Sequence, residues 1–203
     1  MRPRDNPFRA QRVDLLAFEP QGTNWEALLA RLQALQFRAA VVGPHGSGKT
    51  TFLEGLADRL AGMGRRPRRL FRNRGGGRAI PEAWLPLVES PCAGDVWLVD
   101  GYEQLGFRER TQLCGAAAGR VGLVATAHRR TRLPTLLHTK TSPALLSHLV
   151  ERLGATLPAE QVIPLFQRHR GNLRDALREL YDREADRFIF VQRPPRMTGG
   201  VPG

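Results

Sequence analysis

The chain has 203 residues, of which 41% are hydrophobic, and its 31 Lys and Arg against 19 Asp and Glu give a formal net charge of +12. This length and composition predict one α/β domain with a small appendage. They argue against a membrane protein, because no apolar run approaches the roughly 18 residues of a membrane span. Two cysteines without metal-ligand spacing, and an N-terminal segment without the apolar core of a secretory signal, favour a cytoplasmic protein, while the positive charge favours anionic partners.

The first predicted segment, 1–38, is an irregular arm followed by a helix. Asn6-Pro7-Phe8 opens the arm. Thr23 and Glu26 have the spacing of a capping box, in which two side chains satisfy backbone N–H groups of the first helical turn, so we expect a helix to start there. Its apolar residues recur at helical spacing: Trp25, Leu28, Leu29, Leu32 and Leu35.

The strongest motif follows an apolar run that begins at Ala39. Residues 43 to 50 match the pattern G-x-x-x-x-G-K-T of a Walker A phosphate-binding loop. Glycines in such a loop let backbone N–H groups point at phosphate oxygens, and the helix that follows adds the positive end of its dipole. Lys49 is expected to reach the outer phosphates of ATP, and Thr50 to offer a hydroxyl to Mg²⁺. The predicted nucleotide-binding residues are Gly43, Pro44, His45, Gly46, Ser47, Gly48, Lys49, Thr50 and Thr51.

The alternative is a glycine-rich turn that matches this pattern by chance. The basic residues argue against it, because Lys49 and Lys140 are the only lysines in a chain whose other basic residues are arginines. One of the two therefore occupies the position at which a phosphate-binding loop requires a compact ammonium group.

A basic stretch runs from Arg65 to Arg78 and includes a run of three glycines. Leu70 and Phe71 are expected to form a short strand within it. One interpretation is a mobile loop that binds nucleic-acid phosphates. The other is a solvated surface loop, because Phe71 is the only aromatic residue that could stack on a base. Its arginines are Arg65, Arg66, Arg68, Arg69, Arg72, Arg74 and Arg78.

Val96 to Asp100 is a continuous apolar run that ends in an acid, which is typical of a buried parallel strand. An Asp at the carboxyl end of such a strand lies where α/β sheets bind ligands, so we expect Asp100 to hold Mg²⁺ through water. The alternative is that it caps the next helix. Glu103, expected in the first turn of a helix at 105–119, is a candidate to polarise an attacking water or simply a charge at a helix N-terminus.

The chain then returns to the sheet. Residues 121–128 predict another buried strand, with Thr126 and His128 near its carboxyl end, where a polar side chain can contact the γ-phosphate or the water. A Thr there is also common as a turn residue, and a lone His is usually a surface residue. Residues 136–139 are expected to form a further strand.

The last third predicts helices. Ser142 is placed as an N-cap with Pro143 at the first helical position, and Pro158 starts a second helix. After Gly171-Asn172 a third helix carries apolar residues at i, i+3, i+4 and i+7, with Arg174 at the border of that face. These helices form a predicted small unit at 142–186 after a core at 39–141, and the tail at 187–203 is expected to be loose.

This order of parts resembles the AAA+ ATPases. The phosphate loop matches that family in full, Val96–Asp100 is similar to its second nucleotide motif, and Leu123–Thr126 is similar to its first sensor strand. The stretch from Gly171 to Leu177 looks like its second sensor. The resemblance implies an α/β P-loop NTPase fold, a three-layer sandwich with a mostly parallel sheet and a small helical lid. It also implies that Thr126 is a polar sensor and that Arg174 contacts the γ-phosphate from the lid.

The chain departs from the family pattern in one place. The family usually has Glu directly after the metal-binding Asp, whereas Gly101 follows Asp100 here and the nearest Glu is Glu103. Rapid hydrolysis is thereby put in question, but nucleotide binding is not. Candidates for an arginine that acts on a neighbouring subunit are Arg129, Arg130 and Arg132. The family's adenine-packing segment resembles the Asn-Pro-Phe arm, which makes Phe8 and Val13 candidates for contact with the base.

Three function classes remain open from the sequence. The favoured one is a Mg-dependent ATPase that acts as a nucleotide-controlled switch and reports to a protein partner or to nucleic acid, with self-association left open. The others are a nucleotide-binding regulatory module with little hydrolysis and a small-molecule P-loop kinase. A kinase lid usually carries several arginines between two helices of the main domain, whereas here the helical segment follows the core strands, which favours the switch.

Overall fold

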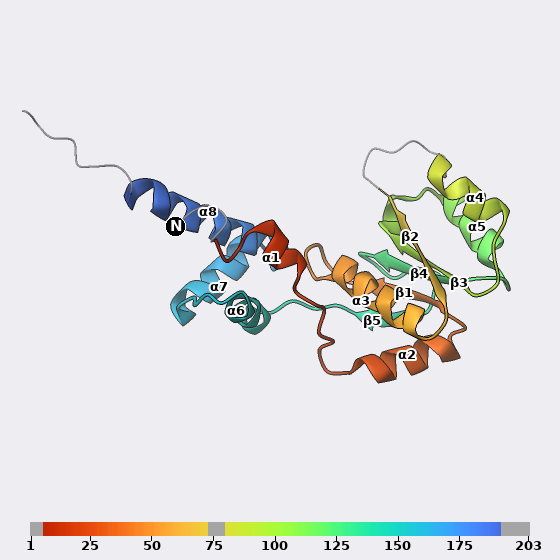
Figure 1. The fold of residues 1–203 in the computed structure, drawn as a ribbon, viewed down its shortest axis with the longest axis horizontal. Helices are drawn as coiled ribbons and strands as arrows, with labels where there is room; N and C mark the ends of the chain where they lie inside the picture. The colour runs from red at the N-terminus through yellow and green to blue at the C-terminus, as the bar shows by residue number, and fades with distance from the viewer. Residues whose placement is uncertain (1–5, 73–79, 192–203) are drawn as a thin grey trace, which may run out of the picture. The chain divides into compact units, whose positions relative to one another are not determined.

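The computed structural model describes residues 6–72 and 80–191, with side chains described up to 186 (Figure 1). The chain divides into two compact units. The core unit is Ala17–Thr141, and the helical unit combines the described residues of Met1–Leu16 and Ser142–Gly203. The sequence predicted a single N-terminal segment at 1–38, whereas the structure divides this segment between the two units.

The core unit is built on a five-stranded parallel sheet in the order β2-β3-β4-β1-β5. All carboxyl ends of the strands therefore lie at one edge of the sheet. β4 and β5, which both come after β1 in the chain, lie on opposite sides of it. The strand order therefore changes direction at β1, and open α/β sheets bind ligands at such a switch point. The strands are β1 (Arg38–Val42), β2 (Arg66–Phe71), β3 (Asp95–Asp100), β4 (Gly122–Ala127) and β5 (Thr135–His138).

Helices cover both faces of this sheet, as Figure 1 shows. Side chains alternate between the two faces along a strand. In β1, Ala39 and Val41 join the hydrophobic core beneath α2 (Trp25–Ala34) and α3 (Lys49–Gly62). Ala40 and Val42 join the opposite core, beneath α4 (Leu85–Glu89) and α5 (Phe107–Ala117). The predicted three-layer α/β architecture is confirmed.

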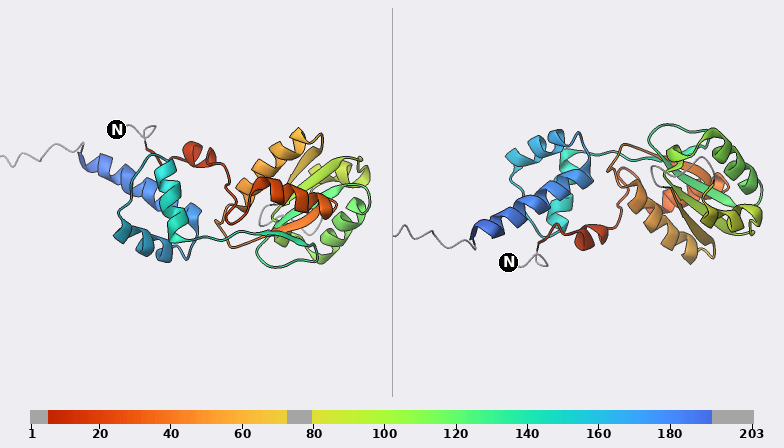
Figure 2. Two further views of the ribbon diagram at one scale, coloured as in Figure 1. Left: turned by 90° about the horizontal axis from the view of Figure 1, so that it is seen from below. Right: turned by 90° about the horizontal axis from the view of Figure 1, so that it is seen from above.

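The helical unit packs four helices around its own core (Figure 2). They are α1 (Ala10–Asp14), α6 (Pro143–Arg152), α7 (Ala159–Arg168) and α8 (Leu173–Val191). Ser142 caps α6 as predicted, since its Oγ accepts from the Leu145 N–H at 3.1 Å. The N-terminal arm belongs to this unit: Asn6 Nδ2 donates to the Tyr181 carbonyl at 3.0 Å, and Phe8 is buried in the core.

Several predicted boundaries were wrong by a residue or more. α2 begins at Trp25 with Asn24 as its N-cap, because the Asn24 Oδ1 accepts from the Ala27 N–H at 2.8 Å, so the expected start at Thr23 is not used. α8 continues through Val191, beyond the predicted limit of 186. No proline lies between Leu173 and Pro194, so the backbone can stay helical that far. The rest of the predicted loose tail, 192–203, lies outside the described residues.

The basic stretch is also different from the prediction. Residues 66–71 form β2, a full edge strand paired with β3, instead of a loop with a short strand at Leu70 and Phe71. Parallel pairing with a buried strand supplies the order that local sequence did not reveal. Arg74, Arg78 and the glycine run lie outside the described residues.

Candidate functional site at the carboxyl edge of the sheet

The phosphate loop connects β1 to α3, as predicted, and it packs tightly against the end of β5. A Cβ added to Gly43 would lie 1.9 Å from Thr139 Oγ1, so no other residue fits at this position. The same Thr139 hydroxyl lies 2.7 Å from Ser47 Oγ, which donates to the Pro44 carbonyl at 2.8 Å. Thr139 was expected only as part of a strand, and nothing in its local sequence indicated contact with the loop.

Lys49 is the first residue of α3, and its side chain folds back over the loop. Its Nζ donates to the carbonyl oxygens of Gly43 at 2.8 Å and Pro44 at 2.7 Å, and it lies 3.3 Å from His128 Nδ1. Burial lowers the pKa of this ammonium group, while the negative charges of Glu103 and Asp100 act in the opposite direction. Lys49 is therefore a desolvated cation with its partners chiefly among neutral oxygens.

Asp100 joins three elements of the site through hydroxyl groups. Its Oδ2 accepts from Thr50 Oγ1 at 2.7 Å, and its Oδ1 accepts from Thr126 Oγ1 at 2.6 Å. The Thr126 hydroxyl accepts in turn from the Gly101 N–H at 3.0 Å. The alternative role as a helix cap receives no support, because no side-chain cap is present on the short 3-10 helix η3 (Tyr102–Gln104) that follows.

Glu103 lies in η3, not in the first turn of the next helix, because α5 begins only at Phe107. One carboxylate oxygen, Oε1, lies 2.8 Å from His128 Nε2. The other, Oε2, is buried and has no hydrogen-bond partner among the described residues. A buried acceptor without a partner is uncommon in folded proteins and marks a place where a ligand or water can bind.

For His128 the sequence left two interpretations open, a contact with the γ-phosphate or the water and an ordinary surface position. His128 is only half-buried, yet one ring nitrogen contacts Glu103, and the other lies within 3.3 Å of both Lys49 Nζ and the Gly43 carbonyl. Its ring also contacts that of His45 in the phosphate loop in a tilted arrangement, with centroids 3.7 Å apart and planes at 42°. The one sequence signal was its place at the carboxyl end of a predicted buried strand.

Gly101 occupies the position at which the family pattern has Glu. Its φ is +82°, a left-handed conformation that residues with a Cβ rarely adopt. A Cβ there would also lie 2.6 Å from the Arg72 carbonyl oxygen. A Glu directly after Asp100 would therefore require the backbone of both segments to shift.

The remaining candidates fall in different places. Arg174 is an exposed residue of α8 in the helical unit, whereas Glu103, Thr126 and the phosphate-loop residues lie in the core unit. Phe8 and Val13 pack in the core of the helical unit. Thr51, in the first turn of α3, is half-buried. Arg129, Arg130 and Arg132 are exposed on the chain that follows β4.

Most arginines of the basic stretch face carboxylates. Asp95, almost fully buried, pairs with Arg66 at 2.9 Å and with Arg68 at 3.4 Å, while Arg69 pairs with Glu54 at 2.8 Å. Arg72 is itself buried, and its guanidinium lies 2.9 Å from the Glu109 carboxylate, which also accepts from the backbone at the start of α5.

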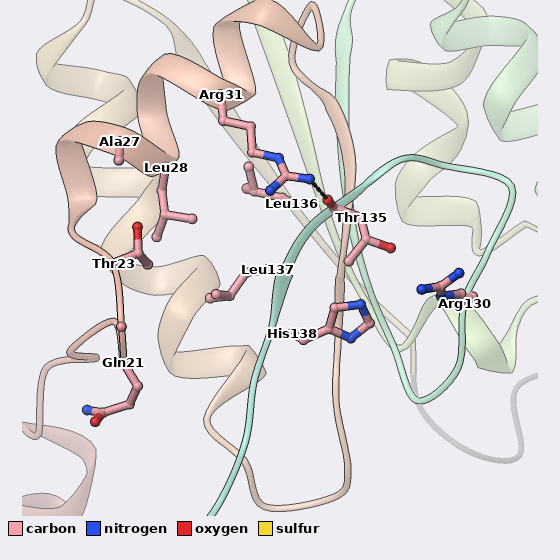
Figure 3. Close-up of a pocket in the computed structure, with 11 residues that line it drawn as sticks. Gln21, Thr23, Ala27, Leu28, Arg31, Arg130, Thr135, Leu136, Leu137 and His138 are labelled. Carbon is pink, nitrogen blue, oxygen red and sulfur yellow. Dashed lines mark hydrogen bonds between the residues drawn. The ribbon is translucent and has the colours of Figure 1, made fainter.

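A cavity of about 530 Å³ lies between α2 and β5, and Figure 3 shows its lining. Arg31 crosses it and donates to the Thr135 carbonyl at 2.9 Å, while Leu28 and Leu136 supply apolar surface. None of its lining residues belongs to the predicted nucleotide site. Among the residues that the structure describes, no group of three or more His, Cys, Asp or Glu could hold a metal ion, and no helix could cross a membrane.

The parallel sheet in the order β2-β3-β4-β1-β5, the helices on both faces and the glycine-rich loop after β1 define an α/β P-loop NTPase fold. The solved structures that share this fold include RuvB from Thermotoga maritima, an AAA+ P-loop ATPase. A structure of this RuvB, described as a Holliday junction branch migration motor, matches with a TM-score of 0.56 and 18% identity, over 82% of this chain and 62% of that chain. A point variant of the same protein matches with a TM-score of 0.58 and 18% identity, over 82% and 63%.

The chain thus spans less than two thirds of the length of these RuvB chains. The likeness confirms, at the level of the fold, the resemblance to AAA+ ATPases. No protein-family model matches the chain, and no curated protein sequence matches it significantly.

Proposed function

We propose that this protein is a Mg-ATP-binding ATPase with an AAA+-like core that hydrolyses ATP slowly and acts as a nucleotide-controlled switch. The observation that supports it most is the meeting of Lys49, Thr50, Asp100 and Thr126 at the carboxyl edge of three neighbouring strands. Phosphate-binding lysine, metal-binding hydroxyl and carboxylate are the parts that phosphoryl transfer requires.

The residues present fit a nucleotide with its metal. Thr139 packs so closely on Gly43 that a side chain is excluded there, and glycine-rich loops of this kind can direct backbone N–H groups at phosphate oxygens. Thr50 and Asp100 supply a hydroxyl and a carboxylate, the oxygen donors that Mg²⁺ prefers, 2.7 Å from each other. Bound there, Mg²⁺ would neutralise developing charge on the phosphates. Lys49 would orient the outer phosphates through charge-assisted hydrogen bonds.

Glu103 is the group proposed to orient the attacking water. Its Oε2 is a buried acceptor without a partner among the described residues, so it can accept a proton or a hydrogen bond from water. Thr126 is proposed as the polar sensor that fixes Asp100 from the opposite side. Gly101 supports slow turnover, because its backbone conformation does not accommodate the Glu that this fold usually has there.

Arg174 is proposed to read the γ-phosphate. The apolar side of α8 is used within the helical unit, where Leu173, Ala176 and Leu177 are buried, and Arg174 is exposed. Its guanidinium can form a forked contact with a phosphate. One charge-assisted contact of about 1.5–3 kcal/mol would change the closed population by roughly 10- to 150-fold between ATP and ADP states.

The partner is proposed to be nucleic acid or a protein. The net charge of +12 and the exposed arginines of β2 favour a polyanion, and RuvB, which shares the fold, is a Holliday junction branch migration motor. The ion pairs of Asp95 and Glu54 with these arginines reduce the charge available for such contacts. A regulatory module with little hydrolysis is the second candidate, and the closed position at Gly101 favours it.

The test uses the only two lysines in the chain. Lys49→Ala is expected to weaken Mg-ATP binding from a Kd in the micromolar range, about −8 kcal/mol, by about 100-fold or more. Lys140→Ala, which removes an exposed lysine, is expected to leave it unchanged. Calorimetry on the folded variants measures both. Equal ATP affinity for wild type and Lys49→Ala would exclude the proposed nucleotide site.

A further inference from the structure

The ammonium group of Lys49 has no spare donor. An ammonium carries three N–H groups, and Lys49 Nζ already contacts Gly43 O, Pro44 O and His128 Nδ1 at 2.8, 2.7 and 3.3 Å. To donate to a phosphate it must give up at least one of these contacts. The contact with His128 is the longest and the only one to a side chain that can move by itself.

The two ring nitrogens of His128 have different partners. Nε2 lies 2.8 Å from a carboxylate oxygen of Glu103, which can only accept, so Nε2 carries a hydrogen. Nδ1 lies between a donor, Lys49 Nζ at 3.3 Å, and an acceptor, the Gly43 carbonyl at 3.2 Å. An unprotonated Nδ1 is satisfied only while Lys49 donates to it. If Lys49 moves to a phosphate, Nδ1 faces an acceptor, so the ring must turn or take a proton from solvent.

The ring's neighbours restrict the first response. The His45 ring centroid lies 3.7 Å from that of His128, which leaves little room for a partial turn, and a half-turn would break the contact of Nε2 with Glu103. A proton on Nδ1 keeps both contacts, lets Nδ1 donate to the Gly43 carbonyl, and gives His128 a positive charge beside Glu103. Three titratable side chains contact this ring: Lys49, Glu103 and His45.

We propose that His128 is a positioning residue that holds the Glu103 carboxylate and signals to it whether Lys49 is engaged with phosphate. With Lys49 folded back, His128 is neutral and binds Glu103 through one hydrogen bond. With Lys49 drawn to the nucleotide, His128 becomes a cation and fixes Glu103 Oε1, which leaves Oε2 aimed for water. The inference rests on the proposed function, because it assigns the step that couples ATP binding to the hydrolytic glutamate.

The coupling between Lys49 and His128 can be measured without nucleotide. In ¹⁵N spectra of the five histidines, assigned with His128→Gln, the wild-type Nδ1 signal is expected at the position of an unprotonated acceptor at neutral pH. Lys49→Met removes the donor and the neighbouring charge, so the Nδ1 signal should move toward the protonated position. Lys140→Met should leave it unchanged. The same His128 signals in wild type and Lys49→Met would overturn the proposal.

Turnover then tests the link to Glu103. His128→Ala is expected to lower kcat for ATP by about 10- to 100-fold, because a misplaced catalytic group loses about that much, and to change KM little. His128→Gln keeps a donor for Glu103 and should recover part of the rate. His138→Ala, an exposed histidine at the end of β5, is the matched control and should keep the wild-type rate. A purely structural role would change KM and stability without rescue by Gln.

A double variant tests whether His128 acts through Glu103. If His128 acts only through Glu103, the double variant His128→Ala, Glu103→Gln should be no slower than Glu103→Gln alone. Multiplying effects would mean that His128 acts elsewhere and would refute the proposal. If wild type binds no ATP, the proposed function fails, while the spectra of wild type and Lys49→Met still decide whether Lys49 controls His128.

Discussion

Lys49 at the phosphate loop and the group of arginines along β2 are both positively charged, but their partners differ. At the phosphate loop, Lys49 contacts two backbone carbonyls and an imidazole nitrogen, none of which carries a negative charge. Along β2, Arg66, Arg68 and Arg69 each pair with a carboxylate, and the following Arg72 is buried against Glu109. A cation held by neutral oxygens can exchange them for a phosphate at low cost, whereas a cation paired with a carboxylate is already neutralised.

This difference explains why a high net charge alone does not indicate the candidate site. Lys49 and the β2 arginines are all prominent in the sequence, but of these only Lys49 lacks a direct carboxylate partner among the described residues. The comparison also separates Asp100 from Glu103. Asp100 has both oxygens bonded to hydroxyls, whereas Glu103 has one oxygen without a partner in the described part of the chain.

The largest expected effect tests whether the group of arginines along β2 is structural. Arg72→Met leaves the buried Glu109 carboxylate without its cation and is expected to destabilise the fold by about 3–5 kcal/mol. Arg69→Met, which removes one side of an exposed pair, should cost about 0–1 kcal/mol. Denaturant unfolding of both variants measures the difference, and equal small losses would show that the buried pair contributes no more than a surface pair.

The next effect sharpens the difference between the two acids at the phosphate loop. Glu103→Gln is expected to keep Mg-ATP affinity and to lower hydrolysis by about 100-fold, equivalent to about 2.7 kcal/mol. Asp100→Asn should instead weaken the dependence on Mg²⁺. Steady-state ATP turnover at varied Mg²⁺ distinguishes them, with the exposed Glu54→Gln as control. If Glu103→Gln turns over ATP at the wild-type rate, the protein is better described as a binding module.

A smaller effect would test the charge balance on β2. Asp95→Asn removes the carboxylate shared by Arg66 and Arg68, so both arginines become available to nucleic-acid phosphates. The slope of the logarithm of the DNA-binding constant against the logarithm of the salt concentration should then become steeper by up to about 0.9 per freed contact. Replacing Arg66, Arg68 and Arg69 with Gln should make this slope shallower. Binding titrations from low to moderate salt measure the slope, and an absence of DNA binding at low salt would assign these residues to structure alone.

The smallest effect concerns the free energy of unfolding that is lost by burying the charge of Lys49. Burial lowers the pKa of its ammonium in the folded state below the ordinary value of 10.5, so protonation favours the unfolded chain. This penalty is fully present below the lowered pKa and disappears as pH rises past the unfolded value. Lys49→Met should therefore gain stability relative to wild type at neutral pH, and the gain should shrink toward pH 10.5. A gain that is the same at both pH values would show that the charge is not the cause.

Prediction from the sequence was most successful for features that depend on residues close together in the chain. The phosphate loop, the apolar strands before Asp100 and Thr126, and the cap at Ser142 each follow from a short run of sequence whose chemistry allows few alternatives. The short helix α4 was not predicted, because it is only five residues long and apolar periodicity is weak over that length.

The structure decided what depends on residues far apart in the chain. Thr139 meets Ser47 across 92 positions and His128 meets Lys49 across 79, because β4 and β5 both lie beside β1 in the sheet. Local patterns cannot report such contacts, since they arise only when strand order is set. The amino-acid sequence by itself thus determined the P-loop fold class and the loop that could bind phosphate. Tertiary packing decided that residues 66–71 of the basic stretch form a paired strand and that Glu103 contacts His128. It also decided that the backbone at Gly101 does not accommodate a Glu side chain.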